Sequence, residues 1–146
     1  MNNFSIADAK DKPDAGIASW WFVFRGQKML LGRSAGKITL PQVRTLSELG
    51  LSAMYQRFIG GIDGIPCFAA SVPDDTAVPR EMDFHGLRSI FGSIEEDAFG
   101  MSLRALSIIN WENTHKYCGC CGAPVVRRED ILAQQCSACG FTVFPR

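Results

Sequence analysis

Four of the six cysteines in this sequence fall into two identical short motifs near its carboxyl end. Each motif reads C-x-x-C-G, and fourteen residues separate Cys118 and Cys121 from Cys136 and Cys139. Two thiolates with two residues between them can grip one edge of a metal ion, and the glycine that follows allows the chain to turn away in a left-handed conformation. The spacing is one residue shorter than the zinc pattern of about 15 to 20 residues. The motifs therefore predict one tetrahedral Zn²⁺ site with four thiolate ligands.

Such a site would be structural rather than catalytic. Four thiolates leave no open coordination position at which the metal could activate water. The metal would instead order a segment that is too short to bury a core of its own. The alternative is that these cysteines are simply reduced, or joined by adventitious disulfides.

Two cysteines and both histidines stand outside this pattern. Cys120 lies inside the first motif, but it is too close to Cys118 for a metal knuckle, so we interpret it as a bystander. Cys67 lies in an apolar stretch, which is typical of a small buried hydrophobic residue rather than of a reactive thiol. His115 could exchange with a cysteine ligand, but with four well-spaced cysteines a packing or solvated role is the better interpretation, and His85 has no partner motif.

Apolar runs separated by turn residues predict antiparallel hairpins in the first half of the chain. The aromatic-rich run at residues 20–24 is typical of a buried strand, and residues 25–28, which include a glycine, form the turn that follows it. Asp63-Gly64 between two apolar runs is a good hairpin signal, because glycine accepts a positive φ. Residues 84–92 have mixed helical character. The expected strands are residues 20–24, 29–31, 38–41, 57–60 and 67–72.

The clearest helix begins near Ser93, which could cap it, and ends near Asn113. The acidic residues 95–97 suit the positive end of the helix dipole, an interpretation that we prefer to a carboxylate metal site. Small ribbon strands are expected at residues 125–126 and 131–133. The predicted fold class is α+β, with antiparallel β hairpins and a long helix followed by a small four-cysteine zinc ribbon. The helix stripe expected to face the core is Phe99, Leu103, Leu106 and Ile109.

The overall composition excludes several classes of protein. Hydrophobic residues make up 47% of the 146 positions, which is enough for a core, and fifteen basic residues balance fifteen acidic ones. No whole-protein field therefore attracts nucleic acid or an anionic membrane. No apolar run reaches the roughly 20 residues of a membrane span, and the polar residues 1–18 predict a loose start rather than a signal peptide. We expect a cytoplasmic protein, where cysteines stay reduced and favour metal.

Several of these segments resemble one known family. Residues 105–122, which contain Trp111 and the first cysteine pair, are similar to the helix-to-zinc junction of the NADH pyrophosphatases of the Nudix superfamily. Residues 136–140 and the segment Phe144-Pro145-Arg146 also resemble that family, in which such a segment leads into the catalytic Nudix domain. Residues 58–69 are similar to the family's N-terminal domain.

The resemblance implies a domain organisation and a function. Residues 1–113 would form an NADH pyrophosphatase-like N-terminal domain, and residues 114–146 a zinc ribbon leading into a Nudix domain. The whole enzyme would be a homodimer that hydrolyses the diphosphate of NAD(H) to nicotinamide mononucleotide and AMP with Mg²⁺ or Mn²⁺. NAD-capped RNA is a further substrate that the resemblance implies. Phe144 matches the family's aromatic residue before the proline, and the match implies contact with the nucleotide.

The catalytic motif of that family is not present in these 146 residues. The Nudix box, G-x₅-E-x₇-R-E-U-x-E-E-x-G-U, places glutamates on one helix, whereas Gly92 has Ala98 at the position of the first glutamate. No catalytic residue can therefore be assigned by resemblance. We expect this chain to be the non-catalytic front portion of a larger enzyme.

Two other classes of function stay open. A zinc ribbon that binds nucleic acid or protein is one, but residues 114–146 carry a formal charge of only +2, which a zinc centre with four thiolates brings near neutral. Phosphate binding requires a denser basic patch. The other class is a stand-alone, acyl-carrier-like or regulatory module, which rests only on the missing active site.

The aromatic residues at the carboxyl end predict a contact surface. The segment Phe141-Thr142-Val143-Phe144 contains more apolar surface than a small ribbon can bury. We expect this segment, with the zinc ribbon, at or near both the dimer interface and the nucleotide site of the whole enzyme, because exposed apolar clusters usually mark contact surfaces. The alternative is that Phe141 and Phe144 pack back on the long helix.

Overall fold

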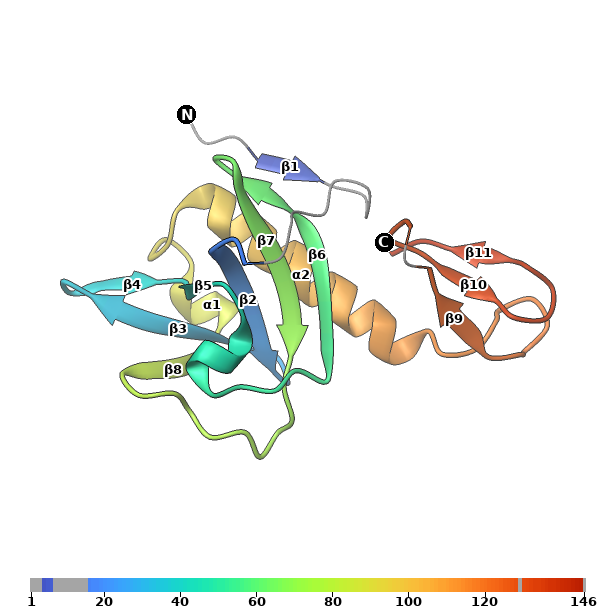
Figure 1. Ribbon diagram of the computed structural model, residues 1–146, viewed down its shortest axis with the longest axis horizontal. Coiled ribbons are helices and arrows are strands. Elements are labelled where there is room, and N and C mark those ends of the chain that lie inside the picture. Colours follow the sequence, from blue (N-terminus) through green and yellow to red (C-terminus); the bar gives the residue numbers. More distant parts are fainter. Residues whose placement is uncertain (1–3, 7–15, 129, 146) are drawn as a thin grey trace.

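The computed structural model of the protein describes residues 4–6, 16–128 and 130–145. Figure 1 shows a large sheet with one long helix packed across it, and a small sheet at the carboxyl end of that helix. We call the large sheet and its helices the body, and the part after the long helix the ribbon. The strands of the large sheet are β1 (Phe4–Ile6), β2 (Ser19–Arg25), β3 (Lys28–Ser34), β4 (Lys37–Thr39), β5 (Gln42–Val43), β6 (Tyr55–Ile62), β7 (Ile65–Ser71) and β8 (Met82–Gly86). The other elements are a 3₁₀ helix (Leu46–Leu49), α1 (Leu87–Ile90), α2 (Glu96–Thr114), β9 (Val125–Arg127), β10 (Gln134–Cys136) and β11 (Thr142–Val143).

The α+β class predicted from the sequence is confirmed, with one addition to the sheet. The main strand order is β1-β6-β7-β2-β3-β4, while β5 pairs with β2 and β8 pairs with β3. Hairpins are antiparallel as expected, but β2 and β7 run parallel at the centre. The expected loose start is wrong for Phe4–Ile6, which pair with β6; residues 1–3 and 7–15 lie outside the described part.

Strand β2 is central because both of its faces are apolar. Trp21 and Val23 point to one face and Phe22 and Phe24 to the other, and all four are buried. A strand covered on both sides reads as a continuous apolar run rather than an alternating one. The 3₁₀ helix covers the first face with Leu46, and α2 covers the second.

The hairpin predicted at Asp63-Gly64 is confirmed between β6 and β7. Both residues adopt left-handed backbone conformations, with φ of 52° at Asp63 and 78° at Gly64. This is the geometry of the tight turns that match the twist of the two strands. The turn places Ile62 and Ile65 opposite each other at the end of the hairpin.

Helix α2 ends where predicted, but its start and its buried face differ. Glu95, not Ser93, is the residue before the first turn, and the Ser93 amide instead closes the turn after α1. Leu103 of the expected core stripe is 48% exposed. Ile109 of that stripe is buried, and Phe99 and Leu106 pack partly buried against the core. The buried face is centred on Met101, Ala105 and Ile108, which recur at the same helical spacing one row away. The buried helix residues are Met101, Ser102, Ala105, Ile108, Ile109 and Trp111.

Two further expectations were displaced along the chain. Residues 84–92 divide into the end of β8 and the short helix α1. The second ribbon strand lies at Gln134–Cys136, not at residues 131–133. The described part of the chain contains no helix that is long and apolar enough to cross a membrane.

Candidate metal centre

The two cysteine motifs come together at one end of the ribbon. Cys118 and Cys121 lie between α2 and β9, Cys136 ends β10, and Cys139 lies in the turn before β11. Their sulfur atoms all lie within 4.8 Å of one another. The Cys118 and Cys139 sulfurs are 3.7 Å apart, and those of Cys121 and Cys136 are 3.4 Å apart. A tetrahedron with Zn–S bonds of about 2.3 Å places its sulfurs roughly 3.8 Å apart, so the arrangement fits a zinc ion.

Each motif forms the same backbone turn around its first cysteine. The amide of Cys120 donates to the Cys118 sulfur at 3.3 Å, and the amide of Ala138 donates to the Cys136 sulfur at the same distance. The glycines after the two motifs both have positive φ, 81° and 79°, as expected from the sequence. Backbone N–H groups aimed at sulfur stabilise the charged thiolate, which is the form that binds metal.

The electrostatics of the first cysteine in each motif agree with this role. The backbone N–H of Cys139, followed by that of Ala138, lowers the pKa of the Cys136 thiol to about 6. The backbone N–H of Cys121 likewise lowers the pKa of Cys118. The amides directed at these two sulfurs thus favour the thiolate, which is the form that binds metal.

Other candidate ligands lie outside this cluster. Within the described ranges, no other group of three or more metal-binding side chains is brought together. Cys120 is exposed, and His115 caps α2, where its ring nitrogen lies 2.9 Å from the Thr114 hydroxyl. Cys67 is fully buried in β7, and burial raises the pKa of its thiol to about 12, which fits the predicted inert role.

A buried arginine that sequence reasoning missed connects the ribbon to the body. Arg57 of β6 is 7% exposed and pairs with Glu112 of α2 at 3.2 Å. Its guanidinium also donates to the backbone carbonyls of Arg128 and Ile131, at 2.9 and 2.5 Å. The second carboxylate oxygen of Glu112 accepts a 2.7 Å hydrogen bond from Gln134 of β10. The only signal in the sequence was one arginine in an otherwise apolar strand. We call these five residues the Arg57 network.

A hollow of about 310 Å³ lies where the end of α2 meets the ribbon. Phe144, the residue predicted to contact a nucleotide, lines this hollow and is 56% exposed. Trp111 lines it too, and the indole N–H of Trp111 is buried without a hydrogen-bond partner in the described part of the molecule. The two predicted positions of Phe144 were an exposed contact surface and packing on the long helix. The structure combines them, because the ring lies beside the end of α2 and is still half exposed. The lining residues are Asn110, Trp111, Thr114, His115, Val143 and Phe144.

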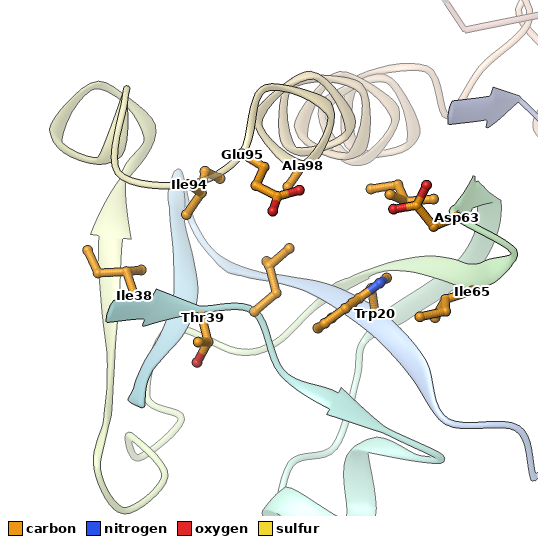
Figure 2. A pocket seen from close by; sticks show the side chains of 10 residues that line it. Trp20, Ile38, Thr39, Asp63, Ile65, Ile94, Glu95 and Ala98 are labelled. Atoms are coloured by element: carbon orange, nitrogen blue, oxygen red, sulfur yellow. The ribbon is translucent and has the colours of Figure 1, made fainter. Parts of the chain in front are cut away.

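A second hollow of about 310 Å³ lies at the opposite end of α2 (Figure 2). Its walls come from β2, β4, the β6–β7 hairpin and the start of α2, and they are mostly apolar. Two carboxylates, those of Asp63 and Glu95, belong to its lining, and among the described residues no basic side chain does. The described residues that line the hollow beside Phe144 include no acidic side chain.

Comparison with known proteins gives matches along nearly the whole chain. Residues 18–111 match the family model described as NADH pyrophosphatase-like rudimentary NUDIX domain, and residues 113–144 match the NADH pyrophosphatase zinc ribbon domain. A relative from Deinococcus radiodurans, named NAD-capped RNA hydrolase NudC, is 31% identical over all of this chain and 50% of its own length. The protein of the same name from Stutzerimonas stutzeri is 29% identical over 91% of this chain and 47% of its own length.

The chain thus spans about half the length of the curated relatives that it matches. The two family models follow each other in the order of the body and the ribbon, and the second covers all four clustered cysteines. The resemblance predicted from the sequence is confirmed: the chain belongs to the NADH pyrophosphatase family of Nudix proteins, of which it contains the NUDIX-like domain and the zinc ribbon.

Proposed function

We propose that this chain is the N-terminal, non-catalytic part of a Nudix hydrolase that cleaves the diphosphate bond of NAD(H). The products would be nicotinamide mononucleotide and AMP, and NAD-capped RNA is a second substrate of the same chemistry. The observation that carries the proposal is the pair of adjacent family matches, supported by relatives named as NAD-capped RNA hydrolases. The boundary between the two units would fall near residue 113, and the reduced cysteines fit a cytoplasmic enzyme.

The ribbon would bind one structural zinc ion through Cys118, Cys121, Cys136 and Cys139. The sulfur spacing and the amides directed at sulfur support this assignment. With four thiolates the ion has no position for water or substrate, so it supplies stability and no chemistry. Its contribution is to hold β9, β10 and β11 together, and with them Phe144.

Hydrolysis would require carboxylates that these 146 residues do not provide. In a Nudix hydrolase, glutamates of the Nudix box hold Mg²⁺ or Mn²⁺ at the diphosphate, and no such box occurs in this sequence. The 146 residues alone should therefore release no AMP from NADH at any Mg²⁺ concentration. The full-length enzyme, which we propose to be a homodimer, is the positive control. Release of AMP by the 146-residue chain at a rate near that of the full-length enzyme would overturn the assignment.

Phe144 would contact one of the two aromatic rings of the dinucleotide. Its ring is half exposed and borders a hollow whose described lining has no acidic side chain. A stacked aromatic pair contributes roughly 0.5–1.5 kcal/mol, which corresponds to about a tenfold change in affinity at the upper end.

The test is Phe144→Ala in the full-length enzyme, with Phe141→Ala as the matched control. Phe141 is exposed to a similar extent and lies three residues away, but it does not line the hollow. We expect Phe144→Ala to raise KM for NADH by up to about tenfold with unchanged zinc content, and Phe141→Ala to leave KM within about twofold. Equal kinetics for both variants and the parent would remove Phe144 from the nucleotide site.

A protein-binding ribbon is the competing function, favoured by the exposed side chains of Tyr117, Val126 and Phe141. The same experiment separates the two. If the ribbon is a contact surface for another subunit or domain, both Phe141→Ala and Phe144→Ala should weaken assembly, which sedimentation measures. Any rise in KM should then accompany the loss of assembly in both variants instead of being confined to Phe144→Ala.

A further inference from the structure

The Phe144 hollow is lined by residues of both the body and the ribbon. Asn110, Trp111 and Thr114 come from α2 of the body, whereas Val143 and Phe144 come from β11 and the residue after it in the ribbon. Its shape therefore depends on the orientation of the ribbon relative to α2. The zinc ion cannot fix this orientation, because all four cysteines lie within the ribbon itself.

We infer that Arg57 is a positioning residue that fixes the orientation of the ribbon on the body, and through it the position of Phe144. The part of this inference that concerns substrate rests on the proposed function. Arg57 belongs to β6, its ion-pair partner Glu112 belongs to α2, and its backbone partners Arg128 and Ile131 belong to the ribbon. One guanidinium thus connects the sheet, the helix and the ribbon.

The contacts of the Arg57 guanidinium are buried, so their loss should be costly. Arg57 is 7% exposed and the Glu112 side chain 13%, so the ion pair is largely shielded from water. Loss of Arg57 would leave two carbonyls and a carboxylate without their donor, which is more costly than the loss of an exposed ion pair. The planar guanidinium reaches all three acceptors at once, and a lysine ammonium has no such fork of donors.

Two neighbouring contacts support the same orientation. Leu132, which follows Ile131, packs against the apolar core beneath α2. The guanidinium of Arg127 lies 5.5 Å from the centre of the Tyr55 ring, which is on the same strand as Arg57. The segment between β9 and β10 therefore contacts the body at several points. Among these contacts, the hydrogen bonds of Arg57 are the buried polar ones.

The test compares Arg57→Met with Arg104→Met in the full-length enzyme. Arg104 is the control because it is a partly buried arginine whose hydrogen bond to the carbonyl of Ile59 stays within the body. The readouts are zinc content, amide hydrogen exchange of residues 125–136, and KM and kcat for NADH. Arg57→Lys tests whether the fork is required, and Glu112→Gln serves as a milder second variant if Arg57→Met does not fold.

We expect Arg57→Met to increase exchange in residues 125–136 by about tenfold or more while one zinc per chain is retained. KM should rise by about tenfold with kcat within about twofold, Arg57→Lys should not restore it, and Arg104→Met should change neither readout. Unchanged exchange in Arg57→Met, or an equal increase in Arg104→Met, would overturn the positioning role. Increased exchange with unchanged KM would support that role and overturn the proposed contact of Phe144 with substrate.

Discussion

The body and the ribbon of this protein are stabilised by different means. In the body, large side chains such as Phe22, Phe24 and Met101 are fully buried on either side of the sheet–helix contact. In the ribbon, the described residues that are buried are small or polar, and several large ones are exposed. The buried ribbon residues are Cys118, Ala133, Gln134 and Cys136, and the exposed large ones are Tyr117, Val126, Phe141 and Phe144.

The difference follows from length. The body has enough residues to remove an apolar core from water, and such burial contributes about 25 cal/mol per Å². The ribbon has about thirty residues, and chains of that size usually need a metal or disulfides. Its apolar side chains are therefore free to lie on the surface, where they can contact a substrate or another domain. The comparison predicts that each region can be damaged without damaging the other.

The largest effect is expected from Cys136→Ser. Cys136 is buried, it accepts two backbone N–H bonds, and its loss leaves a three-ligand site. The free energy of structural zinc binding is on the order of 10 kcal/mol, so the ribbon should lose both metal and structure. Zinc analysis should fall well below one ion per chain, and amide exchange should rise across residues 115–145. Amide exchange in the central body strands β2, β6 and β7 should stay as slow as in the parent protein.

Chelation of zinc from the unmodified protein should give the same pattern with one refinement. The knuckles should exchange first and the connection between β9 and β10 last, because the Arg57 network holds that connection independently of metal. Iron in place of zinc, or a zinc content that does not depend on Cys136, would contradict the metal assignment.

A second, smaller effect should be confined to the body. Phe22 of β2 is fully buried beneath α2, and Phe22→Ala should lower the free energy of unfolding by about 3–5 kcal/mol. Urea unfolding followed by tryptophan fluorescence measures this loss. The native variant should still bind one zinc per chain, since Phe22 belongs to the body core and not to the ribbon. Loss of zinc from the folded variant would show that the two regions are not independent.

The sequence predicted those features that depend on local chemistry. The cysteine spacing identified the four-cysteine cluster, and Asp63-Gly64 identified the hairpin, because a knuckle and a tight turn are each set by a few consecutive residues. The continuous aromatic run of β2 likewise indicated a buried strand, although not that its neighbour β7 runs parallel.

Features that depend on distant contacts were missed or misplaced. The helix stripe was assigned by its spacing, but a neighbouring row with the same spacing, Met101, Ala105 and Ile108, faces the sheet, so Leu103 is half exposed. Arg57 and Glu112 are 55 residues apart, and nothing in their local sequence pairs them. The site residues fixed by short motifs could therefore be named in advance, whereas the contact that orients them could not.

The smallest effect is expected at the fifth cysteine of the ribbon region. Cys120 is exposed, its sulfur lies outside the metal cluster, and its contribution to the knuckle is a backbone amide that donates to the Cys118 sulfur. Serine keeps that amide, so Cys120→Ser should retain one zinc per chain and change stability by no more than about 0.5 kcal/mol. The same replacement at Cys67 provides the contrast, because it puts a hydroxyl into the body core and should cost roughly 1–3 kcal/mol. Thermal unfolding and zinc analysis of the two variants side by side measure both values. Zinc loss in Cys120→Ser would mean that Cys120 exchanges with a neighbouring ligand, and the ribbon would then be held by a mixture of metal sites rather than by one.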